Sequence, residues 1–237
     1  CPYLKGIHQT LESWRPWKRE DGWSMSNKEI QAAKLVEHDM EVDYENDKDA
    51  PVEVMGVKRL RSDVAALQTL ISGPVPVKRK ARPEFSALAI YGFGDASGKG
   101  FGSSFSINGK VIFRHGQWAQ SVEMESSNYR ELANLVFAVE EAAAQGHLDD
   151  CELFLFTDNT TAESAYYKGT SSVRPLFDLM LRMRKLQMEG GVIIHVVHIA
   201  GTRMIEEGTD GLSRGSLLEG VMSGSAMLSH IPLHLSA

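Results

Sequence analysis

The sequence predicts an α/β layer fold around a mixed five-stranded sheet. Three apolar segments follow one another closely, at Leu88–Gly94, Gly100–Ile107 and Lys110–Gln117. Two further strand-like segments, Glu152–Thr157 and Val192–Ile199, are separated by stretches with a helical pattern. Strands joined by short turns pair antiparallel, whereas strands joined through a helix pair in parallel. We therefore expect three antiparallel strands, then two parallel strands, flanked by helices and preceded by an N-terminal extension.

Composition limits the class of protein. The 237 residues are 43% hydrophobic and 24% charged, which is ordinary for one large globular domain or a medium domain with extensions. No run approaches the ~20 consecutive apolar residues of a membrane helix, so we expect no membrane partner. The N-terminus CPYLKGIHQT lacks the pattern of a signal peptide, and because it has no Met we expect a processed product or a piece of a longer polypeptide.

Two further counts narrow the setting. The two cysteines, Cys1 and Cys151, are too few for a disulfide framework or a zinc site, which favours a reducing intracellular compartment, the cytoplasm or the nucleus. The net charge of −6 argues against a general nucleic-acid coat protein, because such proteins are normally basic. That argument loses force where the acids bind divalent cations.

The pattern divides the chain into three regions. Residues 1–83 lack clean periodicity and are interpreted as an N-terminal extension or connection. Residues 84–215 form the predicted α/β domain. Residues 216–237 are a weakly amphipathic C-terminal tail.

The extension contains two linkers of opposite charge. Asp39–Asp49 is acidic but lacks the glycine and closing glutamate of a calcium loop, so it is interpreted as solvated. Pro74–Pro83 is basic and extended, and it suits either contact with phosphates or a solubilising hinge. Helices are expected from Ser26 or Asn27 to Met40 and over Leu60–Ser72. The tryptophans of this region are expected to pack rather than to stack on bases, namely Trp14, Trp17 and Trp23.

Each element of the α/β region has a local signal. Asn108-Gly109 is a strong hairpin sequence. Ser126, Ser127 and Asn128 precede a helix over Tyr129–Gln145, which presents an apolar stripe and ends at Gly146. Further helices are expected over Thr160–Tyr167, Val173–Met188 and Thr209–Ser213, with a loop over Thr202–Thr209.

Four acids stand where no hydrophobic core requires them. They are Asp95 at the end of the first strand, Glu131 in the first turn of the first helix, Asp158 at the end of the fourth strand and Asp210 at the start of the last helix. Strand ends and helix starts on one edge of such a sheet converge, so we expect these carboxylates to lie close together in one site at that edge. Taken singly, Glu131 also suits a helix N-terminus, and Asp158 and Asp210 suit helix caps.

Neighbouring carboxylates of this number require cations. Like charges raise one another's pKa, so the four groups cannot all be ionised together without compensation. Mg²⁺ and Mn²⁺ prefer oxygen ligands. Two such ions ~3.5–4 Å apart form the clamp used for in-line displacement at phosphodiesters. The pattern therefore predicts a metal site in which the acids are ligands rather than proton shuttles.

The motifs around these acids resemble, in the same order, those of a ribonuclease H domain of the retroelement type. The resemblance spans Leu88–Gly215, a little over half of the chain, and the DNTT and DGLSR forms are most similar to DIRS-like and Ty3-like retrotransposons. It implies a reverse transcriptase domain in the same polyprotein, with residues 1–83 as its tail or a connection. The four motifs are GDASGKGFG, SSNYRELANL, LFTDNTTA and HIAGTRMIEEGTDGLSRG.

The resemblance also implies roles for individual residues. Asp95, Glu131, Asp158 and Asp210 would be the catalytic acids and the ligands of two Mg²⁺ ions, with Mn²⁺ able to substitute, and Asp95 would bridge the ions. Proteins distinguish RNA from DNA at the 2′-OH, so the implied reaction is hydrolysis of the RNA strand of an RNA–DNA hybrid by metal-activated water. Substrate contacts are expected from Ser97, Asn128, Asn159, Arg203 and Arg214.

Two features depart from a simple match. The predicted loop Thr202–Thr209 lacks the histidine that many family members carry there, which implies altered turnover rather than inactivity, and His198 is interpreted as structural. The basic residues Arg182, Arg184 and Lys185 suit either contact with the backbone of the hybrid or a solvated helix face.

A non-catalytic ribonuclease H-like module for nucleic-acid binding or scaffolding is the main alternative. Acids at all four positions count against it, because a scaffold gains nothing from a repulsive cluster. A transposase or integrase core would place its glutamate last, and a proofreading exonuclease would have an acid at Ser97. An ATPase of the P-loop type would need GxxxxGK[ST], which the sequence lacks.

Overall fold

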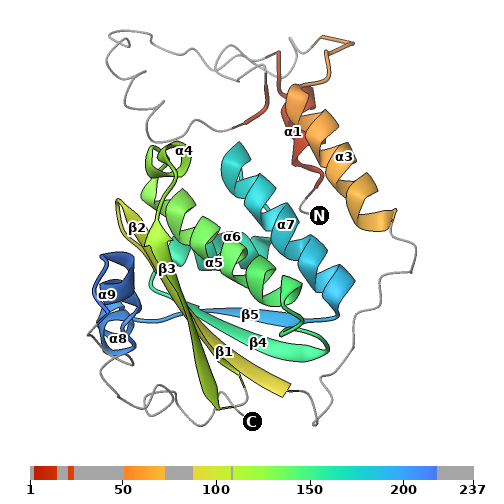
Figure 1. Ribbon diagram of the computed structural model, residues 1–237. Helices are drawn as coiled ribbons and strands as arrows, with labels where there is room; N and C mark the ends of the chain where they lie inside the picture. Colours follow the sequence, from red (N-terminus) through yellow and green to blue (C-terminus); the bar gives the residue numbers. More distant parts are fainter. Residues whose placement is uncertain (1–2, 15–20, 24–50, 73–87, 108, 218–237) are drawn as a thin grey trace, which may run out of the picture. The chain divides into compact units, whose positions relative to one another are not determined.

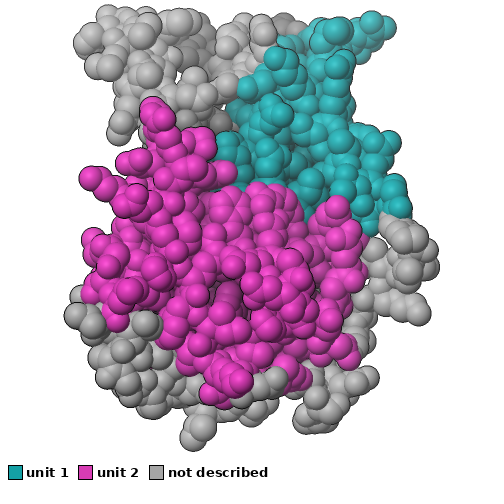
Figure 2. Space-filling model, viewed as in Figure 1, with its two compact units in different colours: residues 1–78, 168–181 teal, residues 79–167, 182–237 magenta. Residues whose placement is uncertain are grey.

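The structure is a computed structural model that describes residues 3–14, 21–23, 51–72, 88–107 and 109–217. The chain forms two compact units, drawn in different colours in Figure 2. Unit 1 comprises residues 1–78 with 168–181, and unit 2 comprises residues 79–167 with 182–237.

Several sequence predictions fall on other parts of the chain. The boundary between residues 83 and 84, both charged linkers and the helix before Met40 lie outside the described residues, as does the tail beyond residue 217. Within the described part, no helix combines the length and the apolar character that a membrane span requires.

Unit 1 contains a cluster of aromatic side chains beside two helices. Helix α1 spans Lys5–Leu11 and α3 spans Lys58–Ile71. Trp23 and Phe177 pack edge to face with ring centroids 5.2 Å apart, so Trp23 is a packing residue as expected. Helix α3 confirms the helix predicted over Leu60–Ser72. Helix α1 was not predicted, because its seven residues carry no side-chain cap that would signal a helix start.

Unit 2 is built on the predicted mixed five-stranded sheet. The strand order is β3-β2-β1-β4-β5 (Figure 1). Strands β1, β2 and β3 pair antiparallel, whereas β4 pairs in parallel with both β1 and β5. This arrangement confirms the predicted fold class. The strands are β1 (Leu88–Ala96), β2 (Gly100–Ile107), β3 (Lys110–Gln117), β4 (Cys151–Thr157) and β5 (Ile193–His198).

Helices cover both faces of this sheet, as Figure 1 shows for α5 (Ser127–Ala144) on one side and α8 (Gly201–Glu206) and α9 (Thr209–Ser213) on the other. On the α5 face, Leu132 and Leu135 are almost completely buried. On the opposite face, the rings of Phe93 and Phe156 stack 4.8 Å apart and pack with Met204 of α8. Burying side chains of this size contributes roughly 1.5–3 kcal/mol each. The remaining described helices after β3 are α4 (Gln120–Glu123), α6 (Thr160–Lys168) and α7 (Arg174–Gly190).

Two local predictions were wrong. The segment Thr202–Thr209 was expected to be a loop, but its first part belongs to α8, because Met204 gives this short helix an apolar side chain to bury on the sheet. Helix α5 begins at Ser127, since the Ser126 side chain accepts a hydrogen bond from the Tyr129 backbone N–H at 3.2 Å. Glu131 is therefore the fifth residue of the helix and lies just beyond its first turn.

Helix α9 packs directly on the backbone of β2 at two glycines. A Cβ atom on Gly102 would lie 2.6 Å from both Leu212 Cβ and the Thr209 carbonyl oxygen, and one on Gly100 would lie 2.5 Å from the Ser213 carbonyl oxygen. Only a residue without a side chain permits this approach. The two glycines therefore bring Asp210, which lies on α9, to the edge of the sheet where β1 ends.

We predict that Gly102→Ala displaces α9 and lowers the free energy of unfolding by about 1–3 kcal/mol, the usual cost of overpacking. Gly98→Ala is the matched control in the same hairpin, because a Cβ atom there meets nothing within 4 Å. Urea denaturation of both variants measures the difference. Equal stability of Gly102→Ala and Gly98→Ala would contradict the proposed packing constraint.

Candidate metal centre

The pairing of β1 with β4 brings two of the predicted acids together. Phe93 pairs with Phe156 in the parallel register, and these two residues stack on the α8 face. Asp95 and Asp158 each follow two residues later. Because side chains alternate between the faces of a sheet, the two aspartates continue on the same face as the two phenylalanines. The register therefore explains why these two acids converge.

The third acid comes from α5. Glu131 is 8% exposed and Asp95 is 6% exposed, whereas Asp158 is half-buried. Each of the three offers a carboxylate oxygen, and these oxygens all lie within 4.8 Å of one another. We call Asp95, Glu131 and Asp158 the acidic triad. A group of oxygen donors this close suits a hard divalent cation.

Burial and mutual repulsion perturb two members of the triad strongly. Burial, followed by the negative charges of Asp95 and Asp158, raises the pKa of Glu131 to about 9. Burial also raises the pKa of Asp95 to about 6, and a hydrogen bond from the Ser213 side chain opposes that rise. In the absence of a cation, the protein therefore holds protons in this site at pH values where a solvated carboxyl is ionised.

One buried atom indicates that a cation fits the triad. Glu131 Oε2 is buried and has no hydrogen-bond partner among the described residues. A buried carboxylate oxygen without a partner is costly, and coordination to a cation removes that cost. An all-carboxylate donor set suits a hard divalent cation.

The fourth predicted acid is held by an arginine. Arg214 donates to the Asp210 carboxylate through Nε and Nη2, at distances of 2.8–3.2 Å. Asp210 lies near enough for its charge to raise the pKa of Asp95, and the Arg214 charge lowers it. Asp210 is not part of the group of oxygens within 4.8 Å. The structure thus brings three of the four acids into one set and places the fourth beside it in an ion pair.

The other predicted substrate contacts are distributed around the triad. Ser97 Oγ donates to the Ser213 carbonyl at 2.7 Å and accepts from the Gly100 backbone N–H at 2.9 Å, which fixes the β1–β2 turn against α9. Asn159 donates to Asn128 Oδ1 at 3.0 Å. Asn159 directly follows Asp158 in the sequence, and Asn128 lies three residues before Glu131. Their contact therefore lies beside the triad.

The structure pairs the remaining predicted basic residues with acids or carbonyls of unit 2. Arg203 Nη1 lies 2.9 Å from Glu206. Arg182 pairs with Glu140, Lys185 pairs with Glu189 at 3.7 Å, and Arg184 donates to the Tyr166 carbonyl at 2.8 Å.

The asparagine after Asp158 caps the next helix, because Asn159 Oδ1 accepts from the Ala162 N–H at 2.8 Å. Asp158 itself is therefore not that cap.

Sequence analysis missed a buried network that joins the elements of the triad. Asn134 is fully buried on α5, one turn after Glu131, and its Nδ2 donates to the Asp95 carbonyl at 2.9 Å and to the Gly102 carbonyl at 2.8 Å. Arg114 donates to Asn134 Oδ1 at 3.3 Å and to Glu141 at 2.8 Å. Asn134 thus ties α5 to β1 and β2. The available signal was a polar residue within an otherwise apolar helical stripe.

The chain is similar to several solved structures. No protein-family model matches it, and no curated protein does so either. Solved structures with a similar arrangement include RNase H1 from the halophilic archaeon Halobacterium salinarum, with 18% identity and a TM-score of 0.43, covering 56% of this chain and 98% of that chain. Another is the N-terminal RNase H domain of a Mycobacterium tuberculosis protein, fused to maltose-binding protein, with 15% identity and a TM-score of 0.42, covering 55% and 98%.

A third similar structure is a foamy viral protease–reverse transcriptase in complex with double-stranded DNA, with 9% identity and a TM-score of 0.35. That comparison covers 73% of this chain and 28% of the viral chain. The strand order and the pairing directions of unit 2 are themselves those of the ribonuclease H-like fold that the sequence predicts. Unit 2 therefore has the ribonuclease H-like sheet topology that the sequence predicts, together with an acidic triad suited to a divalent metal.

We predict that the metal-free protein loses stability as the pH rises from about 4 to about 9. The folded-state pKa values of Asp95 and Glu131 lie above those of the unfolded chain, so the folded state keeps protons that the unfolded chain has released. Glu131→Gln should remove much of this slope and stabilise the metal-free protein at pH 8, on the order of 1–3 kcal/mol. Denaturation in EDTA at several pH values tests this, with the exposed Glu123→Gln as control. An unchanged slope in Glu131→Gln would contradict it.

We also predict that Asn134→Ala lowers the free energy of unfolding by about 1–3 kcal/mol, because it leaves two buried carbonyls without their donor. In the folded protein it should weaken Mn²⁺ binding by roughly 10- to 100-fold, as loss of a residue that orients metal ligands usually does. Calorimetric titration below the melting temperature measures the affinity. Glu141→Gln, at the half-exposed outer end of the network, should change it little, and a normal Mn²⁺ affinity in Asn134→Ala would mean that Asn134 acts on stability alone.

Proposed function

We propose that the protein is a metal-dependent endonuclease that hydrolyses the RNA strand of RNA–DNA hybrids. The single observation that carries this proposal is the acidic triad at the strand ends of a ribonuclease H-like sheet, with its carboxylate oxygens within 4.8 Å of one another. A repulsive cluster of buried carboxylates destabilises a protein unless a bound cation uses it. This argument favours an enzyme over a non-catalytic scaffold.

Roles for the individual residues are proposed from their positions. Asp95, on the central strand, would hold two Mg²⁺ ions together with Glu131 and Asp158, and Asp210 would be a further ligand. Cations bound there would supply an activated water and neutralise the charge that develops on the phosphate. Asn128 and Asn159, beside the triad, are proposed to meet the sugar edge of the substrate, where the 2′-OH identifies the RNA strand.

The setting of the activity is proposed from the sequence motifs. Their resemblance to retrotransposon ribonuclease H domains supports a place beside a reverse transcriptase domain in the same polyprotein, in the cytoplasm or the nucleus. The RNA–DNA hybrid made during reverse transcription would then be the substrate. Ser97, Arg203 and Arg214 are proposed as further contacts to its backbone.

We predict that Asp95→Asn and Asp158→Asn each reduce Mg²⁺-dependent cleavage of a labelled hybrid by more than roughly 100-fold. Mutation of a residue that only orients metal ligands already lowers affinity or activity by about 10- to 100-fold, so loss of a ligand should lower activity further. Asp210→Asn should retain more activity than either, since its carboxylate already has a counter-ion in Arg214. Asp149→Asn, on an exposed turn, is the matched control. Circular dichroism verifies that all four variants are folded.

The substrate controls are double-stranded RNA and double-stranded DNA, each with Mg²⁺, Mn²⁺ and EDTA. Cutting confined to the RNA strand of the hybrid, and stopped by EDTA without unfolding, is the expected result. Full activity of Asp95→Asn and Asp158→Asn would exclude the triad as the site. Binding of the hybrid without cleavage under all conditions would favour the scaffolding module.

A further inference from the structure

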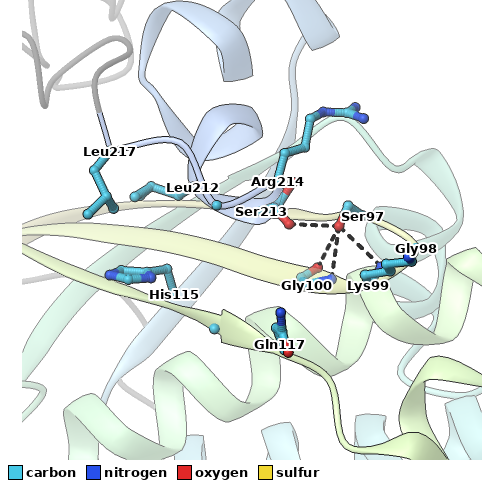
Figure 3. Close-up of a pocket in the computed structure, with 12 residues that line it drawn as sticks. Ser97, Gly98, Lys99, Gly100, His115, Gln117, Leu212, Ser213, Arg214 and Leu217 are labelled. Carbon is cyan, nitrogen blue, oxygen red and sulfur yellow. Dashed lines mark hydrogen bonds between the residues drawn. The ribbon is translucent and has the colours of Figure 1, made fainter.

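A cavity lies on the α9 face of the sheet, and the residues that line it are outside the acidic triad. It has a volume of about 590 Å³, within the size range of ligand sites. Its floor is the backbone of the β1–β2 hairpin around Gly100, and its walls come from β3 and from the chain at the end of α9 (Figure 3). The side chains that give the cavity its chemistry are Lys99, His115, Gln117, Leu212, Arg214 and Leu217.

The strand register places this cavity in line with the triad. Asp95 pairs with Gly102, and Gly102 pairs in turn with His115. Directly paired residues point to the same face, so Asp95 and His115 face α9 from opposite sides of Gly102. Adjacent strands lie about 4.8 Å apart, which puts His115 roughly 10 Å from Asp95 along this row. Helix α9, seated on Gly102, therefore separates the triad from the cavity.

The charge of the cavity is opposite to that of the triad. Among the described residues that line it, none is acidic, whereas Lys99 and Arg214 are cationic and His115 and Gln117 offer hydrogen-bond donors. Arg214 already pairs with Asp210 on the triad side. Lys99 is exposed and forms no ion pair with another described residue. In a chain of net charge −6, this local set of donors favours an anion over a cation.

The walls indicate what kind of anion fits. Leu217, which is 44% exposed, gives the cavity an apolar wall beyond the end of α9. A nucleotide combines the two requirements, since its phosphate accepts from Lys99 while its sugar or base covers apolar surface. Phosphates along one strand are about 3.4 Å apart in the axial direction, so the roughly 10 Å between Asp95 and the β3 wall of the cavity at His115 corresponds to about two or three nucleotides.

We propose that this cavity is a nucleotide subsite, which holds a phosphate-bearing nucleotide of the substrate strand about two or three positions away from the cleaved linkage. The position assigned to this nucleotide relative to the cleaved linkage rests on the proposed nuclease function. Binding of the nucleotide in the cavity does not require cleavage. Lys99 is the residue that contacts the phosphate, and His115 and Gln117 line the side of the subsite that belongs to β3.

The first experiment measures binding without cleavage. A labelled RNA–DNA hybrid is titrated with the full chain in EDTA, over a series of salt concentrations, and its fluorescence anisotropy is recorded. Lys99→Gln should bind about threefold to tenfold more weakly, and the slope of log affinity against log salt should fall by about 1, as expected for the loss of one phosphate contact. Lys99→Arg should restore both values. Lys110→Gln, at the far end of β3, removes the same charge outside the cavity and should change neither.

The second experiment locates the contact on the substrate. Hybrids with one neutral methylphosphonate at a time are cleaved by the native chain and by Lys99→Gln in Mg²⁺. A neutral group two or three nucleotides from the cut should slow the native chain and have no further effect on Lys99→Gln. Additive effects at every position would overturn the assignment of Lys99, and so would equal binding losses in Lys99→Gln and Lys110→Gln.

The two proposals can fail separately. If the native chain does not cleave the hybrid while Lys99→Gln still binds it more weakly in EDTA than Lys110→Gln does, the nuclease function is wrong and the subsite stands. If the native chain cleaves the hybrid while Lys99→Gln matches Lys110→Gln in affinity and salt dependence, the subsite is wrong and the nuclease function stands.

Discussion

Repulsion among three closely spaced carboxylates is the constraint on which the structure of unit 2 depends. Asp95, Glu131 and Asp158 come from three different elements, and every contact that holds those elements together acts against this repulsion. Hydrophobic packing on both faces of the sheet supplies the opposing free energy, with Phe93 and Phe156 stacked one step below the aspartates. The same strands therefore carry both the core residues and the acidic residues. In a domain that binds no cation, the repulsion among these acids would lower the free energy of unfolding without serving a function.

Close backbone approach is how the fold concentrates the acids. A Cβ atom on Gly94 would lie 2.7 Å from Leu135 of α5, and one on Gly102 would lie 2.6 Å from α9. A Cβ atom on Gly201, at the start of α8, would lie 3.0 Å from Asp158 Oδ2. Each of three helices thus approaches the acidic edge at a glycine. Asn134 then fixes the orientation of α5 relative to both β1 and β2 by hydrogen bonds. Packing alone does not set this orientation.

The sheet and three of its acids could be predicted because their signals are local. The Asn108-Gly109 turn, the apolar run before Asp95 and the serine cap before Glu131 are each readable within a few residues. The missed features depend on distant partners. Helix α8 is stabilised because Met204 packs against Phe93 and Phe156 on the sheet. No residue near Met204 in the sequence indicates this distant contact. The Arg214–Asp210 pair and the Asn134 network depend likewise on how α9 and α5 are seated.

Helix α9 connects these observations, because it stands between two sites of opposite charge. Its Asp210 raises the pKa of Asp95, while Arg214, one turn later, lowers it and also lines the cationic cavity. A substrate phosphate in that cavity would compete with Asp210 for the Arg214 guanidinium, which can donate to either group. Release of Asp210 from this ion pair would leave its carboxylate without a counter-ion beside the triad. Substrate binding on one side of α9 would in this way strengthen cation binding on the other side.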